Sequence, residues 1–305
     1  MSINTLVEKI KELSNPTVVG LDPRIEYIPE HIVKPLLARY GENLHAVSRC
    51  VLEFNKGLVD ALCDIVPAVK PQSAYYELLG PDGAACLKET IDYAKSRGMY
   101  VILDGKRNDI GATAEAYADA YLGVSAAGKA AVAPYDADSL TVNAYLGTDG
   151  IAPFLKRCGE RKKSIFVLVK TSNKSSGELQ NLEVGGKPLY AHMAELVAGW
   201  GAELVTPCGY SEVGAVVGAT YPEEQRLVRE ILPHAYFLVP GYGAQGATAR
   251  DIRNAFNADG LGAIVNSSRG IMCAWKKTGR DGFDYLDAAR NEAIRMRDDI
   301  VAAIK

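Results

Sequence analysis

A short charged segment carries the clearest chemistry in this sequence. Directly after an apolar run at residues 100–103, which predicts a buried strand, comes Asp104-Gly105-Lys106-Arg107-Asn108-Asp109. Residues two apart on an extended chain point to the same side, so Asp104 and Lys106 should lie together at the carboxyl end of the strand. Carboxylates on either side of Lys106 favour its ammonium form and aim its proton. The segment therefore indicates a proton donor, and its plain alternative is a surface ion pair.

Elements of two kinds alternate along the whole chain and would position this segment. Apolar runs predict strands at residues 17–21, 65–69, 100–103, 140–142, 165–169, 213–218, 235–239 and 261–265. Helix-like segments lie at residues 43–63, 82–97, 113–129, 187–201, 222–232 and 245–258. Eight such units, with strands that are apolar on both faces, predict an α/β protein with a single-domain (β/α)8 TIM barrel. A doubly wound open sheet is the alternative, because counting strands does not show that the sheet closes.

Two stretches between the predicted elements are long. Residues 23–41 contain three prolines and read as an insertion after the first strand. Residues 171–186 are rich in Ser, Asn and Gly and follow the fifth strand. The second stretch is long for a βα loop, so we expect a lid, and the alternative is a passive surface loop.

Composition excludes several classes of protein. The chain has 305 residues, of which 48% are hydrophobic, and its 34 basic and 37 acidic side chains give a net charge of −3 without a basic block. Nucleic acid is therefore not an expected partner. Membrane spanning is not expected either, because every apolar stretch falls short of roughly 20 residues. The six cysteines form no CxxC pair and the four histidines show no ligand spacing, so we expect reduced thiols, no disulfide framework and no metal site. A cytoplasmic enzyme fits this profile, as would many binding proteins.

Polar residues follow most of the predicted strands. In a barrel, the carboxyl ends of the strands build the active site, and charges gathered there are costly unless partners or a ligand compensate them. Lys70 ends the second strand. It would be a charge partner within the same array of charged residues, and the alternative is an ordinary exposed lysine. Lys170 ends the fifth strand and is a rival active-site lysine, because a buried lysine can form a Schiff base. The other strand-end residues are Asp22, Asn143, Thr171, Ser172 and Arg269.

A glycine-rich segment follows the seventh strand. Residues 241–246 match GxGxxG, but a dinucleotide fingerprint should open the first βα unit and be followed by an acid about 20 residues later. Loops after the seventh and eighth strands of barrels commonly bind phosphate, which fits this position better. We expect backbone N–H groups, a helix beginning near Gln245 and the side chain of Arg269 to hold the anion. The alternative is a tight turn beside a surface arginine.

Taken together, these residues resemble the orotidine 5′-phosphate decarboxylase family, and the flanks at residues 19–24 and 70–77 resemble its longer bacterial group. The match rests on Asp104-x-Lys106-x-x-Asp109-Ile110-x-x-Thr113, Pro240-Gly241-x-Gly243-Ala244-Gln245-Gly246 and Arg269. The first motif alone is shared with sugar-phosphate lyases on the same scaffold, whereas the combination is more specific. One departure is Lys174, where we expect proline; it bears on the stiffness of the lid and not on the chemistry.

The resemblance implies a role for each residue. Lys70 and Lys106 would alternate with Asp104 and Asp109 in a charged array. Asp109, Ile110 and Thr113 would enter the site of a neighbouring subunit, which implies a homodimer; without a partner Asp109 would be a helix N-cap, and both roles are compatible. The remaining substrate contacts would be Asp22 to the ribose, Ser172 to the pyrimidine, Gln245 to both pyrimidine and phosphate, Arg269 to the phosphate, and Pro240 and Gly243 within the same loop.

The reaction implied is loss of CO2 from carbon 6 of orotidine 5′-monophosphate, giving uridine 5′-monophosphate (UMP) in the last step of de novo pyrimidine nucleotide synthesis. No cofactor is expected, so stabilisation of the carbanion would be electrostatic and Lys106 would protonate it. Two alternatives stay open. One is a sugar-phosphate lyase, decarboxylase or aldolase on the same barrel, which would need a divalent metal or a Schiff-base lysine. The other is a non-catalytic nucleotide-binding protein.

Overall fold

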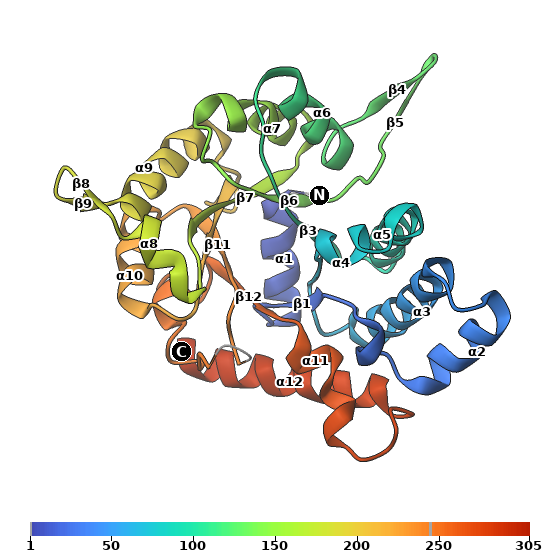
Figure 1. The fold of residues 1–305 in the computed structure, drawn as a ribbon. Helices are drawn as coiled ribbons and strands as arrows, with labels where there is room; N and C mark the ends of the chain where they lie inside the picture. Colours follow the sequence, from blue (N-terminus) through green and yellow to red (C-terminus); the bar gives the residue numbers. More distant parts are fainter. Residues whose placement is uncertain (1, 244–245) are drawn as a thin grey trace.

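The computed structural model describes residues 2–243 and 246–305, and its centre is a closed barrel of eight parallel strands (Figure 1). Around the barrel the strand order is β1-β12-β11-β10-β7-β6-β3-β2. Because β1 pairs with both β2 and β12, the sheet has no open edge, which confirms the predicted (β/α)8 barrel and excludes the doubly wound sheet. The barrel strands are β1 (Thr17–Leu21), β2 (Ala68–Pro71), β3 (Tyr100–Arg107), β6 (Ser139–Val142), β7 (Ser164–Lys170), β10 (Ser211–Val217), β11 (Ala235–Val239) and β12 (Ala263–Ser267).

Helices surround the barrel and cover its outer face. The longer ones are α2 (Glu30–Tyr40), α3 (Leu44–Leu62), α5 (Gly80–Ser96), α6 (Gly111–Tyr121), α7 (Thr148–Arg161), α9 (Leu189–Gly201), α10 (Pro222–Ile231) and α12 (Tyr285–Ile304). Shorter ones are α4 (Ser73–Glu77), α8 (Gly177–Gln180), α11 (Arg269–Met272) and the 3-10 helices η1 (Ile25–Tyr27), η2 (Lys174–Ser176), η3 (Ala202–Leu204), η4 (Arg253–Ala255) and η5 (Ala274–Lys277). The strands are apolar on both faces because helices pack outside them and side chains fill the inside.

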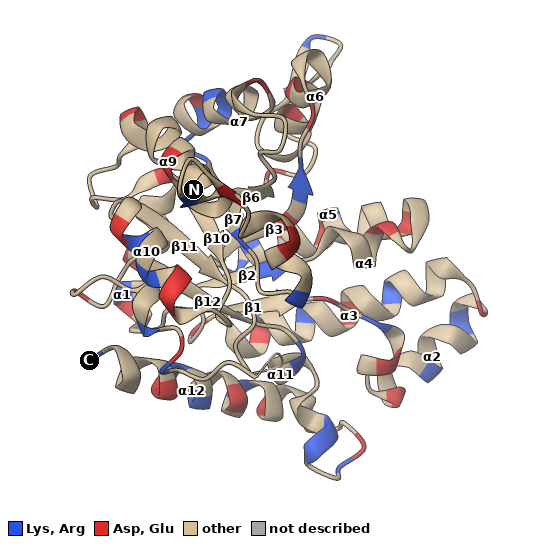
Figure 2. Ribbon diagram, turned by 60° about the vertical axis from the view of Figure 1, so that its left-hand side comes forward, with Lys and Arg blue, Asp and Glu red and all other residues tan. Residues whose placement is uncertain are grey.

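The first helix, α1 (Ile3–Leu13), closes the amino-terminal end of the barrel and lies across the middle of the strand ring in Figure 1. Its buried residues form one cluster with inward-facing strand residues such as Val18, Phe166 and Ile264. The opposite end of the barrel is left free for a site. None of the described helices combines the length and apolar composition needed to cross a bilayer. In Figure 2 acidic and basic residues alternate along outer helices such as α12, and no face of a single sign stands out in that view.

Two predicted helices are wrong in part. The helix expected at residues 113–129 ends at Tyr121, and the antiparallel strands β4 (Ser125–Ala127) and β5 (Ala130–Val132) follow, turning at Gly128 with φ +64°. Of the helix expected at 245–258, the described residues 246–258 contain only η4. There the side chain of Asp251 accepts hydrogen bonds from both the backbone N–H and the hydroxyl of Thr248, and the short η4 follows in place of a long helix. The helix N-terminus expected to hold phosphate near Gln245 is therefore absent from residues 246–258.

Residues 23–41 contain η1 and α2 and pack against the carboxyl-terminal part of the chain. The rings of His31 and Phe283 stack with their centroids 4.6 Å apart. The indole of Trp275 donates a hydrogen bond of 3.0 Å to the carbonyl of Tyr27. These two contacts join residues 23–41 to residues 275–283, near the carboxyl terminus.

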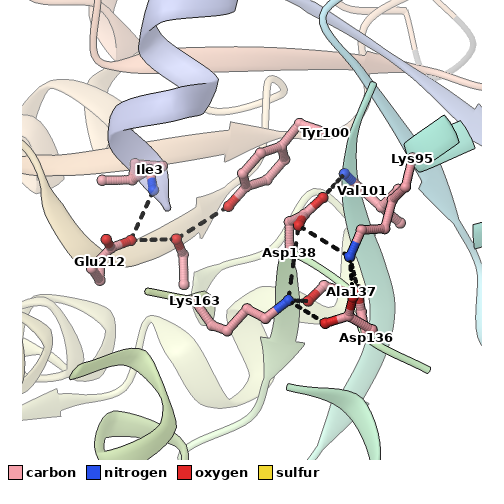
Figure 3. Close-up of polar contacts among 10 residues, drawn as sticks. Ile3, Lys95, Tyr100, Val101, Asp136, Ala137, Asp138, Lys163 and Glu212 are labelled. Atoms are coloured by element: carbon pink, nitrogen blue, oxygen red, sulfur yellow. Dashed lines mark hydrogen bonds and ion pairs between the residues drawn. The ribbon is translucent and has the colours of Figure 1, made fainter. Parts of the chain in front are cut away.

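A buried carboxylate anchors α1 at the base of the barrel (Figure 3). Glu212 accepts hydrogen bonds from the backbone N–H of Ile3 at 2.8 Å and from the hydroxyl of Ser164 at 2.5 Å, and Tyr100 donates to Ser164 at 3.1 Å. Burial raises the pKa of Glu212. The carboxylate thus satisfies a backbone donor that the first turn of a helix leaves without an intrahelical partner.

A second polar cluster in Figure 3 joins α5 to the starts of β6 and β7. Asp136 accepts hydrogen bonds from the ammonium groups of Lys163, at 2.8 Å, and of Lys95. The buried Asp138 accepts from the backbone N–H of Val101 at 2.9 Å. Burial by itself would raise the pKa of Asp136, but the two lysines outweigh it and lower the pKa to about 2.

Asp136→Asn should make the protein less sensitive to acid. A depressed carboxyl pKa contributes stability that is present above the unfolded value, near 3.9, and is lost as the pH falls toward about 2. The difference in thermal unfolding midpoint between the wild type and Asp136→Asn should therefore shrink between pH 5 and pH 3. Asp92→Asn, which alters an exposed pair with Lys88, is the control. A difference that stays constant over this range would refute the assignment.

Candidate active site

A cavity of about 510 Å³ opens at the carboxyl ends of the strands, the end opposite α1. Residues from most barrel strands line it, which matches the expectation that strand-end side chains converge there. Seven of the residues predicted from the sequence are among them: Asp22, Lys70, Asp104, Lys106, Ser172, Pro240 and Arg269. Across residues 2–243 and 246–305, no three His, Cys, Asp or Glu side chains are grouped so that they could hold a metal ion.

Asp104 is the centre of the polar network in this cavity. Its Oδ2 accepts hydrogen bonds from Lys70 Nζ and Gln72 Nε2, both at 2.9 Å. Its Oδ1 accepts from Lys106 Nζ at 2.5 Å and from Thr141 Oγ1 at 2.8 Å. Burial would raise the pKa of Asp104, but the two ammonium groups outweigh it and hold the pKa well below its usual range. The result is an ionised carboxylate in a fixed orientation.

Lys70 is a buried cation in the same network, with 3% of its surface exposed. Burial alone would lower its pKa, but Asp104 and then Asp22 outweigh this effect and raise it. The Oδ1 atom of Asp22 lies 3.9 Å from Lys70 Nζ. This oxygen and Oδ1 of Asn266 are buried acceptors without a hydrogen-bond partner among the described residues. Both residues line the cavity, so a ligand hydroxyl could donate to either atom.

Lys106 has a backbone conformation that residues with a side chain seldom adopt. Its φ is +47°, in the left-handed region, and its backbone N–H donates to Thr141 Oγ1 at 2.9 Å. Such a conformation costs on the order of 1–3 kcal/mol in a residue with a side chain and is concentrated at functional sites. The Lys106 side chain is 45% exposed and lines the cavity. The predicted contact between Asp104 and Lys106 is therefore present, but the strand is not regularly extended at Lys106.

Three of the predicted site residues lie outside this cavity, near the start of α6. Asp109, Ile110 and Thr113 do not line it, and Ile110 is 56% exposed. The N-cap role considered for Asp109 is wrong, because the N-cap residue of α6 is Ile110. The Asp109 carboxylate accepts instead from the backbone N–H of Ile110 at 2.8 Å.

The glycine-rich loop forms part of the cavity wall. Pro240, Gly241 and Tyr242 line the cavity, whereas Gly243 does not. Gly243, with φ +70°, donates its N–H to the carbonyl of Ala247 at 2.9 Å, which closes a tight turn. Gln245 lies outside the described residues. A turn followed by η4 is also not the strand-to-helix junction of a dinucleotide fingerprint.

Lys170 does not reach the cavity, contrary to its expected role as a rival active-site lysine. The pairing of β7 with β10 shifts register between Leu168 and Lys170, so Val169 is an extra residue. A bulge of this kind re-aims the following side chain. Leu168 lines the cavity, while Lys170 is only 1% exposed and packs outside the barrel against Tyr190 and Tyr221.

Sequence reasoning missed three residues of the site. Gln72 lies two residues after Lys70, and this spacing could have placed it on the same side of the extended chain. Thr141 is a polar residue inside a short apolar strand, which could have marked it as facing the cavity. Asn266 directly follows the apolar run of the eighth predicted strand, and this position could have marked it as a cavity residue. Asn143, expected at the end of β6, does not line the cavity.

Comparison with known proteins shows which family this chain belongs to. A family model described as orotidine 5′-phosphate decarboxylase / HUMPS family matches residues 18–278. The chain belongs to this family. An orotidine 5′-phosphate decarboxylase from Rhodopirellula baltica is 46% identical over 289 residues, which are 93% of each chain. One from Caldicellulosiruptor saccharolyticus is 39% identical over 290 residues, which are 95% of each chain.

Solved structures agree with this membership. The OMP decarboxylase of Leishmania donovani superposes with a TM-score of 0.74 at 31% identity, covering 100% of this chain and 99% of its own. The resemblance inferred from the motifs of the orotidine 5′-phosphate decarboxylase family is therefore confirmed, including its bacterial group, because the two curated relatives are bacterial and span nearly the same length.

Proposed function

We propose that this protein decarboxylates orotidine 5′-monophosphate to UMP without a cofactor, as the last step of de novo pyrimidine nucleotide synthesis, in the cytoplasm. The observation that carries the proposal is the array Lys70–Asp104–Lys106, in which four donors fix one ionised carboxylate inside a cavity. All six cysteines are free, which supports a reducing compartment. The relatives with 39–46% identity carry the name of this activity.

In the proposed mechanism the bond between carbon 6 and the carboxylate breaks and its electron pair stays on carbon 6. The substrate carboxylate faces Asp104, and CO2 leaves as a neutral molecule, which removes that repulsion. The Lys106 ammonium stabilises the new carbanion and then donates a proton from Nζ to carbon 6. Because the Lys106 side chain is 45% exposed, solvent can return that proton to its amine.

Magnitudes show why several groups are needed. Two unit charges about 4 Å apart interact by roughly 4 kcal/mol at an effective dielectric near 20. The common range of enzymatic barrier reduction extends to about 23 kcal/mol, far more than one such pair supplies. Binding energy from the distant phosphate would supply more by holding the charged groups together. We assign Arg269 to the phosphate, Gln245 to both the phosphate and the pyrimidine, and Asp22 to the ribose.

Closure over the substrate would come from residues 171–186, with Ser172 against the pyrimidine. Ser172 lines the cavity at the start of this segment, and the segment contains only the short elements η2, α8 and β8 (Glu183–Val184). Short elements with few buried apolar contacts can move at lower cost than the packed strands and helices of the barrel. Pro240 would form part of the cavity wall, and Gly243 would shape the turn that follows it.

A homodimer would complete the site, with Asp109, Ile110 and Thr113 reaching into the cavity of the partner. These residues lie outside their own cavity, and Ile110 is exposed although apolar. On the loop after the neighbouring strand β6, Tyr145 and Leu146 are also exposed. Exposed apolar residues on adjacent loops are typical of an interaction surface.

A Schiff-base mechanism would need a neutral amine that faces the substrate, and neither Lys70 nor Lys170 supplies one. The charge of Asp104 outweighs burial and raises the pKa of Lys70, which keeps this amine protonated. Lys170 lies outside the barrel. The deciding assay follows the absorbance of orotidine 5′-monophosphate with a chelator present, and we expect full conversion to UMP. Loss of activity with chelator would favour a metal-dependent lyase. UMP binding without any absorbance change would favour a non-catalytic nucleotide-binding protein.

Arg269→Ala should weaken binding only of substrates that carry the phosphate. A hydrogen bond to a charged group contributes about 1.5–3 kcal/mol, so KM for orotidine 5′-monophosphate should rise about 10- to 100-fold. The slow reaction of the nucleoside orotidine should not change. Arg39→Ala, on the exposed end of α2, is the control. Equal KM values for the variant and the wild type would remove Arg269 from the site.

A further inference from the structure

Lys170 is a buried cation that the proposed reaction does not use. We propose that Lys170 is a positioning residue: its ammonium group holds the lid segment, residues 171–186, in place and so fixes Ser172 at the edge of the cavity. The kinetic part of this inference rests on the proposed function. The structural part, that Lys170 anchors the segment, does not depend on it.

The direction of the Lys170 side chain follows from the bulge in β7. Val216 pairs with Leu168 and Val217 with Lys170, so Val169 is left over between them. The side chain of Lys170 therefore leaves the barrel between α9 and α10. There its Nζ lies 4.5 Å from the ring centre of Tyr221 and 5.6 Å from that of Tyr190. Aromatic faces attract a cation but do not accept conventional hydrogen bonds from it.

The lid segment supplies the hydrogen-bond acceptors for this cation. Lys170 Nζ donates to Asn181 Oδ1 at 2.8 Å and to Ser176 Oγ at 3.2 Å. Both acceptors are neutral, and burial lowers the pKa of Lys170 with only a partial opposing effect of Glu224. If the segment lifted away at these points, the ammonium would lose both acceptors and be left against two aromatic rings, which accept no conventional hydrogen bond from it. Burying a charge without such partners is costly, so the ammonium resists opening at this point.

The same part of the segment is tied to the residues at the cavity. The side chain of Gln180 accepts from the backbone N–H of Thr171 at 2.9 Å and donates to its hydroxyl at 2.8 Å. From the other side, the hydroxyl of Thr220 donates to the carbonyl of Ser172 at 3.2 Å. Thr171 and Ser172 both line the cavity. A clamp on Ser176 and Asn181 therefore determines where the cavity-lining start of the segment lies.

The test compares Lys170→Met, which keeps the length and removes the charge, with Lys170→Arg, which keeps the donors. The first readout is the rate of trypsin cleavage after the exposed Lys174, with and without UMP. We expect Lys170→Met to be cleaved at least about tenfold faster and Lys170→Arg to lie closer to the wild type. The second readout is kinetic: KM for orotidine 5′-monophosphate should rise more than kcat falls, because the chemical groups are intact.

Asn181→Leu removes the acceptor from the lid side and keeps the lysine. It should reproduce the fast cleavage, and combining it with Lys170→Met should add little, because both changes break one contact. This variant also decides the question if Lys170→Met fails to fold. Cleavage rates and KM values equal to the wild type in both variants would overturn the inference. If the wild type does not decarboxylate the substrate, the proposed function fails, and the cleavage rates still decide whether Lys170 anchors the segment.

Discussion

Lys106→Ala should lower kcat/KM for orotidine 5′-monophosphate by at least about 10⁴-fold while UMP still binds. Proton donation by a placed acid contributes about 10²- to 10⁴-fold, and a preorganised charge at the reacting atom contributes about 10²- to 10³-fold more. Both contributions come from the one ammonium group that lies 2.5 Å from Asp104. UMP carries no carboxylate at carbon 6, so its binding depends mainly on the phosphate, ribose and pyrimidine contacts.

Two measurements separate this loss from a general defect. The first is steady-state turnover and the second is UMP affinity, measured by titration on the same preparation. Lys106→Arg keeps a positive charge but not the position of the proton, so it should also be strongly impaired. Lys34→Ala, in an exposed pair with Glu30, should behave as the wild type. Turnover of Lys106→Ala within about tenfold of the wild type would end the proposed role of Lys106.

Mixing two inactive variants, Lys106→Ala and Asp109→Ala, should restore activity. If Asp109 enters the partner's site, each mixed dimer has one cavity that lacks both residues and one that lacks neither. Random exchange at equal concentrations makes half of the dimers mixed, so about a quarter of all sites should become active. The measurement is turnover after subunits have been mixed, exchanged and compared with each variant alone.

The chain offers a matched control for this experiment. Asp104 and Lys106 contact each other within one chain, so a mixture of Asp104→Ala and Lys106→Ala should stay inactive. In every mixed dimer of that pair, each cavity still lacks one of the two residues. Activity in the control mixture, or no activity in the first mixture although exchange has been shown, would contradict a site shared between subunits.

Local pattern in the sequence determined the class of fold and most of the residues at the cavity. Each predicted strand overlaps one barrel strand, because apolar runs of this length are stable only when both faces are covered. Parallel strands end at one edge of the barrel, so the polar residues that follow them had to converge. This argument alone brought Asp22, Lys70, Asp104 and Arg269 to one cavity.

Contacts between strands decided what the local pattern could not. Thr141 lies on β6, next to the strand that carries Asp104, and donates a hydrogen bond to it; this relation depends on register and not on spacing along the chain. Likewise, simple alternation of side chains would place Lys170 on the same side as Leu168, whereas an extra residue in the pairing with β10 turns it outward.

By itself, then, the sequence determined that charged groups would meet at the carboxyl end of a barrel, since side-chain alternation and strand direction are properties of the local chain. Only the tertiary structure decided which lysine faces the cavity, because a register shift is settled by pairing with a neighbouring strand. It also decided that residues 246–258 form turns and the short η4 and not one continuous helix, because Ala249, Ile252 and Ala255 pack into the core in this conformation.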